Sequence, residues 1–156
     1  MDAPYRHIAC CLDDSPAAER ALEECLRLRD LAPARLTLVH AVAPPPAVAA
    51  FGFWSVDMGM IEDDEREWLR ARATEVPDAD AILLHGHPPL AVCEWAAREG
   101  VDLLVAASHR GVLGRVMFGS FASYLAHHAP CTVLLTRPPA AERAGDRDDE
   151  VASALT

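Results

Sequence analysis

A loop rich in glycine and arginine, SHRGVLGRVMFGS at 108–120, is the segment best suited to hold a ligand. It follows an apolar run and leads into a predicted helix that begins at Gly119 and Ser120. The free backbone N–H groups and the dipole of a helix N-terminus attract anions. Gly119 lets a phosphate approach the backbone, Ser120 adds a hydroxyl, and Arg110 or Arg115 can pair with phosphate oxygens. The alternative is an ordinary Gly-Ser cap with both arginines in solvent, and the residues alone favour neither.

A second group of polar residues, Asp13-Asp14-Ser15, follows the first apolar run. Paired acids at a strand end could bind a metal, as in a phosphorylated receiver domain. That site also needs an acid after the third strand and a lysine after the fifth, but His85 follows the third strand and the chain has no lysine. The receiver interpretation is therefore rejected, and helix N-capping is the favoured role for Asp14.

His85 and His87 have the spacing that places two imidazoles on one face of a strand, so they could bind a metal. No third ligand stands at a known spacing from them. We therefore interpret both as turn residues and predict no metal site.

Composition removes several functional classes. All 14 basic residues are arginine, which excludes a P-loop, a Schiff-base enzyme and a kinase, since each requires a lysine. The 24 acids give a net charge of −10, which argues against binding to nucleic acid. The five cysteines contain no CxxC pair, so we expect buried thiols in a reducing cytoplasm. We find no signal peptide and no apolar run near the ~20 residues of a membrane span.

The elements that position these residues alternate between apolar runs and amphipathic segments. The runs predict strands at 7–12, 36–42, 80–85, 102–107 and 131–136. Helices are expected from Pro16 onward (capped by Ser15 or Asp14), over 61–73, over 88–99 with Gly100 as its stop, and over 119–128. This order predicts an α/β protein with a parallel sheet covered on both faces. Ligands of such sheets bind at the carboxyl ends of the strands.

Two segments stand apart from this pattern. Residues 44–60 are rich in aromatic residues and methionine, and we expect them to pack on the protein or its dimer, with a lid or a partner surface as alternatives. Residues 138–156 are acidic, and we expect a mostly disordered tail, with a short helix at 148–155 as the alternative. The domain itself is expected to span residues 1–137.

The span 5–137 resembles the universal stress protein family. The resemblance lies in a series of short motifs in a fixed order. They are CCLDDS at 10–15, His40-Ala41 at the end of the second strand, Gly86-His87-Pro88 after the third, DLLV at 102–105, and HAPCTVLL at 128–135. It implies a three-layer sandwich of the adenine nucleotide alpha hydrolase-like type, with strand order 3-2-1-4-5.

The loop at 108–120 departs from the pattern of the ATP-binding members, G-x2-G-x9-G-[ST]. Ala107 and Arg110 stand at the first two glycine positions, and eight residues rather than nine precede Gly119-Ser120. This loop resembles the subgroup with a Ser-His-Arg sequence, some members of which also hold ATP. Arg110 brings a cation where glycine would bring only backbone.

Carried over residue by residue, the resemblance implies a nucleotide site. Cys11 and Asp13 would lie beside the adenine or ribose, and Ala41 and Ala106 would line the base pocket. Ala107, His109 and Arg110 would follow the ribose and phosphates, and Gly119, Ser120 and Phe121 would cap the phosphates. For Ala41 and Ala106, simple core packing is an equally good interpretation.

The function that follows is a cytoplasmic stress-response protein that binds ATP, with or without Mg²⁺, or a related adenine nucleotide as a ligand-linked switch. The resemblance implies a homodimer joined through strand 131–136. No nucleophile–base pair stands out, so we do not predict an enzyme. The alternatives are a dimeric scaffold of the same fold that binds no nucleotide, and a hydrolase or nucleotidyl-transfer enzyme.

Overall fold

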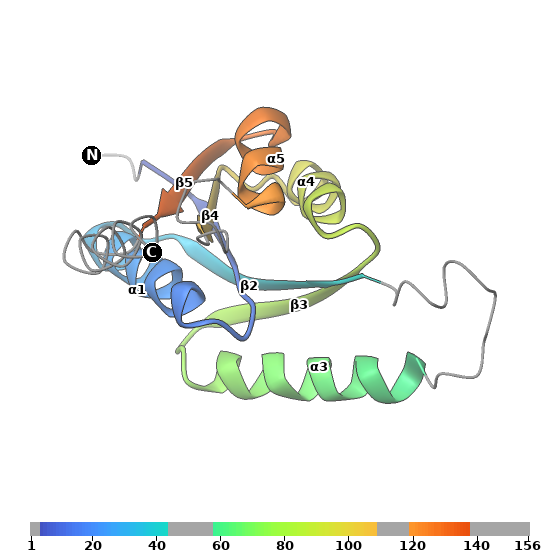
Figure 1. Cartoon of the computed structure of the whole chain (residues 1–156). Coiled ribbons are helices and arrows are strands. Elements are labelled where there is room, and N and C mark those ends of the chain that lie inside the picture. Colours follow the sequence, from blue (N-terminus) through green and yellow to red (C-terminus); the bar gives the residue numbers. More distant parts are fainter. Residues whose placement is uncertain (1–3, 44–57, 109–118, 138–156) are drawn as a thin grey trace, which may run out of the picture.

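The computed structural model describes residues 4–43, 58–108 and 119–137, which form three layers around one sheet (Figure 1). Its strands are β1 (His7–Cys11), β2 (Arg35–Val42), β3 (Ala79–His85), β4 (Leu103–Ala107) and β5 (Thr132–Thr136). Its helices are α1 (Pro16–Leu31), α3 (Met58–Thr74), α4 (Pro88–Glu99) and α5 (Ser120–His128). Every predicted strand and helix is present, although α3 begins three residues before the predicted start at 61.

The sheet has five parallel strands in the order β3-β2-β1-β4-β5, which confirms the predicted topology. β1 and β4 lie at its centre, and every residue of both strands is buried. Strands covered on both faces need continuous apolar runs, which explains why these two segments contain almost no polar residue. The strand order reverses between β1 and β4, so a crevice is expected where these two strands end.

Two pairs of helices cover the two faces of the sheet. α1 and α3 lie on one face, and α4 and α5 lie on the other (Figure 1). Successive side chains of a strand point to opposite faces, so Ile8 and Cys10 pack in the first core while Ala9 and Cys11 pack in the second.

The start of α1 decides between the two predicted caps. Ser15 is the N-cap, and its Oγ accepts a hydrogen bond from the Ala18 N–H at 3.3 Å. Pro16 follows at the first helical position, where its missing N–H costs nothing. Asp14 is therefore not the cap, because the chain turns one residue later than an Asp14 cap requires.

Hydrogen bonds to Asp102 hold β1 in place at the amino-terminal end of the sheet. Its carboxylate accepts the backbone N–H groups of Arg6 at 2.9 Å and His7 at 3.0 Å. The His7 ring in turn contacts Thr37 Oγ1 at 2.9 Å. These contacts tie β1 to the segment before β4, 95 residues further along the chain.

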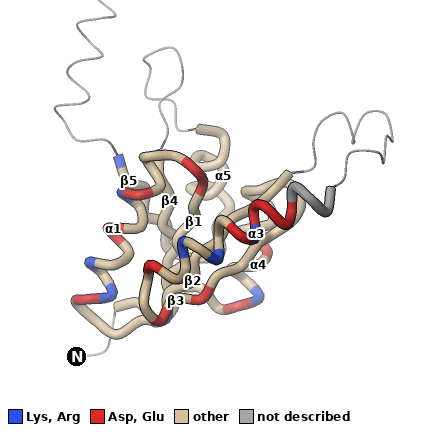
Figure 2. The backbone as a smooth tube through the Cα atoms, turned by 90° about the horizontal axis from the view of Figure 1, so that it is seen from below, with Lys and Arg blue, Asp and Glu red and all other residues tan. Residues whose placement is uncertain are grey.

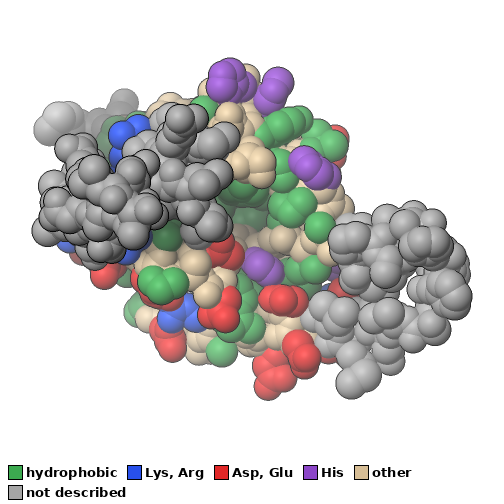
Figure 3. Space-filling view, in the orientation of Figure 1, with side chains coloured by type: hydrophobic (Ala, Val, Ile, Leu, Met, Phe, Trp, Pro, Cys, Tyr) green, Lys and Arg blue, Asp and Glu red, His purple; other side chains and the backbone are tan. Residues whose placement is uncertain are grey.

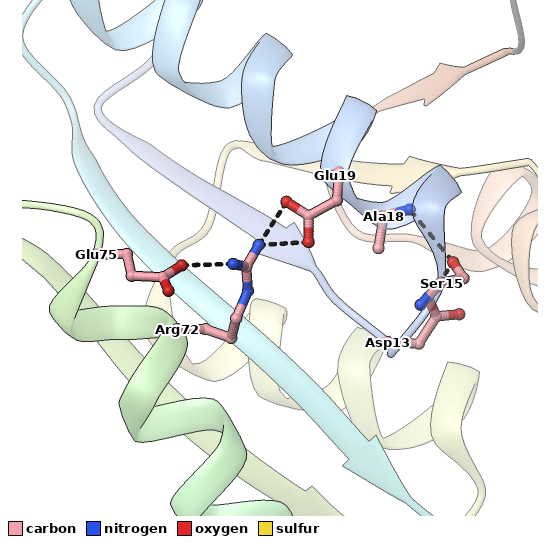
Figure 4. A network of polar contacts seen from close by, with 6 residues as sticks. All are labelled: Asp13, Ser15, Ala18, Glu19, Arg72 and Glu75. Carbon is pink, nitrogen blue, oxygen red and sulfur yellow. Dashed lines mark hydrogen bonds and ion pairs between the residues drawn. The ribbon is translucent and has the colours of Figure 1, made fainter.

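α3 is held to its neighbours by ion pairs. Arg72 pairs with Glu19 of α1 and with Glu75 just beyond the helix (Figure 4). Acidic residues are concentrated in the first half of α3 (Figure 2), and two of them, Glu62 and Glu65, pair with His85 and His40. The helix is thus fixed to α1 at one end and to strand ends at the other.

The predictions for 44–60 and 108–120 lie largely outside the described residues, which omit 44–57 and 109–118, and the prediction for the tail at 138–156 lies wholly outside them. Residues 58–60, expected to belong to the apolar segment, form the first turn of α3 instead. Within the described ranges, no helix combines the length and apolarity that crossing a membrane requires.

Candidate functional site

A cavity of about 450 Å³ lies at the carboxyl ends of β1, β2 and β4, beside the point where the strand order reverses. Its walls come from the strand ends and from the first turns of α4 and α5. The lining residues are Cys11, Leu12, Asp13, Ala18, Val39, His40, Ala41, His87, Pro88, Pro89, Val92, Ala106, Ala107, Ser120, Phe121 and Tyr124. A volume of this size accommodates a small-molecule ligand.

The structure brings together most of the residues that the sequence predicted for a site. Seven of them line this cavity: Cys11, Asp13, Ala41, Ala106, Ala107, Ser120 and Phe121. Gly119 directly precedes the lining residue Ser120, whereas His109 and Arg110 lie outside the described residues.

Asp13 enters the cavity wall from the turn between β1 and α1. Its Oδ1 accepts the Ser15 N–H at 3.1 Å and also accepts the Ser15 hydroxyl. The same hydroxyl oxygen caps α1 at Ala18, so the carboxylate is tied to a helix start (Figure 4). The folded turn thus holds an acceptor at a fixed place beside the cavity.

The N-terminus of α5 supplies hydrogen-bond donors. Its first helical bond runs from the Ser123 N–H to the Gly119 carbonyl at 2.9 Å, so the amides of Ser120 and Phe121 precede any partner within the helix. The Gly119 cap has no side chain to satisfy them, and a Cβ built there meets no atom within 4 Å. An anion can therefore approach these amides.

The N-terminus of α4 has the opposite character. Pro88 and Pro89 occupy its first two helical positions, and neither carries an N–H. His87 is the cap residue and makes no side-chain capping bond. The start of α4 therefore presents the apolar rings of Pro88 and Pro89 to the cavity and no backbone N–H at its first two positions.

The floor of the cavity is apolar. Val39, Val92 and Ala106 are each about 1% exposed. Burial raises the pKa of the Cys11 thiol far above its usual range, so this lining residue is a neutral thiol at physiological pH. A flat apolar group therefore finds matching surface here.

His40 is a lining residue that the sequence analysis did not assign to the site. Its Nδ1 lies 2.8 Å from the Leu12 carbonyl, and its Nε2 lies 3.1 Å from Glu65 Oε2. Its place at the end of the second strand was visible in the sequence. The partner on α3 was not, because only the folded chain brings Glu65 beside it.

His87 and Tyr124 also line the cavity without having been predicted. Their rings lie 6.3 Å apart, and the Tyr124 ring lies 4.4 Å from that of His128. Figure 3 shows histidines gathered over α4 and α5, with acidic side chains toward α3. No set of three His, Cys, Asp or Glu residues within the described ranges has the geometry to hold a metal.

Ser108, the first residue of the glycine- and arginine-rich loop, is not among the lining residues. Its N–H and hydroxyl both bond to the Thr136 carbonyl, at 3.0 and 2.9 Å. This serine therefore fixes the end of β5 beside β4, a structural role that the sequence did not indicate.

Comparison with known proteins gives the same family over nearly the whole domain. A profile of the universal stress protein family matches residues 4–137. A universal stress protein from Thermus aquaticus is 33% identical over 136 residues, which cover 85% of this chain and 99% of that protein. The structure of the universal stress protein UspA from Lactobacillus plantarum is similar with a TM-score of 0.64 and 26% identity, covering 87% of this chain and all of that one.

Two further solved structures have the same fold and are described with an adenine nucleotide. One is a universal stress protein in complex with cAMP, with a TM-score of 0.63, 22% identity and coverage of 85% of this chain and 97% of that one. The other is an Arabidopsis thaliana family protein with AMP bound, with a TM-score of 0.58, 17% identity and coverage of 88% and 94%. With the profile match over 4–137 and the parallel sheet in the order 3-2-1-4-5, these similarities show that the chain belongs to the universal stress protein family.

Proposed function

We propose that this protein binds an adenine nucleotide in the cavity between β1 and β4 and acts as a ligand-linked stress-response switch. The observation that carries the proposal is the pairing of an apolar pocket with the amides at the start of α5, which have no hydrogen-bond partner among the described residues. A flat base fits the first, and a phosphate fits the second. The cAMP and AMP complexes of proteins with the same fold support this choice of ligand.

The two helix starts favour one orientation of the ligand. The phosphate would lie at Ser120, where backbone donors are present, and the base would lie toward Pro88 and Pro89 at the start of α4. Asp13 would accept a hydrogen bond from the base or from the ribose hydroxyls. The other predicted site residues keep the roles given above, including His109 and Arg110 along the ribose and phosphates.

The charge of the cavity bears on which nucleotide binds. Among the described lining residues, Asp13 is the one carboxylate and there is no arginine. A helix N-terminus contributes roughly half a positive charge. This suits the small charge of AMP or cAMP. ATP, which we also propose as a ligand, would need the added charge of Arg110 or of Mg²⁺, and Asp13 is the residue able to contribute a carboxylate oxygen to that ion.

We further propose a homodimer joined through β5. One edge of β5 pairs with β4, and no strand among the described residues pairs with the other. An unpaired edge bearing the half-buried residues Val133, Leu134 and Leu135 favours pairing with a second copy. Light scattering should give twice the chain mass of 16.9 kDa. A monomer at micromolar concentration would contradict the dimer.

The cytoplasm is the compartment that we propose. All five cysteines of the chain are free thiols, which suits a reducing environment.

The decisive experiment is calorimetric titration of the protein with AMP, ADP, ATP and cAMP, using the variant Ser120→Pro. Gly119 has ψ 153°, the extended conformation that a following proline requires, and proline is favoured at the first position of a helix. The variant therefore keeps α5 but removes one N–H and one hydroxyl. We expect its affinity for AMP to fall roughly tenfold or more, the value of a hydrogen bond to a charged group.

The matched control is Ala126→Ser, which changes an exposed residue further along the same helix and should leave affinity unchanged. If no adenine nucleotide binds the unmodified protein at millimolar concentration, the proposed function is wrong. A dimer without bound nucleotide would then support the scaffold.

A further inference from the structure

We propose that Glu65 and His40 act as positioning residues that fix Asp13 at the cavity, and that they make ligand affinity depend on pH. Neither residue is expected to contact the phosphate. The inference rests on the proposed function only in its ligand-binding part. Its structural part concerns the protein alone and can be tested without a ligand.

The first step is the fixed position of Leu12, the residue between β1 and Asp13. Its N–H donates to the Val39 carbonyl at 2.8 Å, and its carbonyl lies 2.8 Å from Nδ1 of His40. Both backbone groups of Leu12 are thus bound to the end of β2. Because Asp13 follows directly, the direction of its backbone depends on the contact to His40.

The second step concerns the protons on His40. Each of its ring nitrogens faces an acceptor, the Leu12 carbonyl on one side and the Glu65 carboxylate on the other. An imidazolium donates at both nitrogens, whereas a neutral imidazole donates at only one. The arrangement is therefore complete only when His40 is protonated, and loss of that proton leaves one acceptor facing a lone pair.

The third step is the confinement of the ring. The His40 side chain is 14% exposed, and the Trp68 ring packs edge-on against it with centroids 5.1 Å apart. The ring therefore has little room to turn away from both partners. Because a carboxylate is a stronger acceptor than an amide carbonyl, the one proton of the neutral ring stays on Nε2 against Glu65, and the Leu12 carbonyl loses its donor.

Other titratable groups surround this pair. Glu62 lies one turn earlier on α3, and its partner His85 ends β3. Asp13 follows β1, and His87 precedes α4. Cys11 is a neutral thiol because burial raises its pKa. The Glu62–His85 pair is a natural control, since its nitrogen and oxygen lie 3.4 Å apart but His85 is 49% exposed and does not line the cavity.

The sharpest variant is Glu65→Gln. A glutamine amide can donate to the unprotonated Nε2 of a neutral imidazole, which leaves Nδ1–H to bond with the Leu12 carbonyl. The variant therefore satisfies the neutral ring, and the position of Asp13 should no longer depend on pH. Glu62→Gln makes the same chemical change at the control pair and should leave this dependence intact.

The experiment has two readouts between pH 6.0 and 8.5. In ligand-free protein, ¹H–¹⁵N NMR follows the His40 ring nitrogens and the backbone amide of Asp13. We expect the Asp13 amide to shift with the same midpoint as the His40 ring in the unmodified protein and in Glu62→Gln, and to stay constant in Glu65→Gln.

Calorimetry with AMP then compares the three proteins at each pH, because the AMP phosphate itself titrates near pH 6. We expect the unmodified protein and Glu62→Gln to lose roughly two- to tenfold more affinity than Glu65→Gln as the pH rises, about the value of one hydrogen bond.

Three results would overturn the inference. The Asp13 amide shift does not follow the His40 ring with pH, the Asp13 amide of Glu65→Gln shifts with pH as in the unmodified protein, or Glu62→Gln abolishes the pH dependence. Failure of AMP to bind any of the proteins would refute the proposed function, while the Asp13 amide would still decide the structural part.

Discussion

The cap of α1 provides a direct test of the geometry beside the cavity. Ser15 is the N-cap, its hydroxyl accepts from Ala18 N–H at 3.3 Å and donates to Asp13, and Asp14 is exposed. Replacing an N-cap serine with alanine leaves one helix N–H without its partner and costs about 1 kcal/mol. The hydroxyl lost by Asp13 adds little, because that carboxylate is exposed and water can replace the donor. We therefore predict that Ser15→Ala lowers the free energy of unfolding by about 1 kcal/mol.

For a chain of 156 residues, that loss corresponds to a fall in the melting temperature of roughly 2–4 °C. Urea unfolding followed by circular dichroism measures the free energy, and a thermal scan gives the second value. Ser15→Thr should retain most of the stability, since threonine also caps helices. Asp14→Ala should change the free energy by less than about 0.5 kcal/mol, as expected for an exposed residue outside the cap.

The stabilities of Ser15→Ala and Asp14→Ala together test where α1 begins. If Asp14→Ala destabilises the protein as much as Ser15→Ala, the helix starts one residue earlier and the described contact of Asp13 is wrong. If Ser15→Ala changes the free energy by less than about 0.3 kcal/mol, the hydroxyl is not a cap at all.

Three other predictions follow from burial and charge. Leu125 is fully buried in α5, so Leu125→Ala should cost about 3–5 kcal/mol in urea unfolding, and a loss below 2 kcal/mol would mean that α5 is loosely packed. A double-mutant cycle of Arg72→Ala and Glu19→Ala should give a coupling of at most about 1 kcal/mol that falls in 1 M salt, because Glu19 is 55% exposed. A hydrogen bond with Cys25, together with burial, raises the pKa of the Cys10 thiol, and burial raises the pKa of the Cys11 thiol, so the folded state keeps both protons above pH 8.5 while the unfolded state loses them. Stability should therefore fall as the pH rises from 8.5 to 10.5, by up to about 1.4 kcal/mol per pH unit for each thiol, and a smaller slope in Cys11→Ala would identify its share.

The strands and their order could be predicted from the sequence because each strand is a short apolar run bounded by turn residues. His7–Cys11 and Leu103–Ala107 are buried on both faces, and such strands leave a clear signal. The sequence also marked Gly100 as the residue that ends α4, and its φ of 63° is the left-handed conformation that glycine adopts freely. The order of the strands came from the resemblance to the family rather than from any local pattern.

The cavity was predicted only in part. Asp13 and Ser120 stand directly after a strand and at a helix start, positions that the parallel sheet itself singles out. His87, Tyr124 and the contact between His40 and Glu65 were missed, because they depend on how α3, α4 and α5 pack against the strand ends. The spacing of His85 and His87 pointed only to a metal site, and nothing in the sequence around Tyr124 or Glu65 marks either residue as part of a site.

The two central strands also constrain the order in which the chain can fold. β1 pairs with β4, and Asp102 binds the backbone N–H of His7 across 95 residues. Closing so long a loop has a large entropic cost before any contact rewards it. During synthesis, the edge of β1 that pairs with β4 therefore stays unpaired until residue 107 has left the ribosome. The chain must pass through a state in which a strand that is buried on both faces in the final fold is only half covered, and this is the stage at which aggregation competes with folding.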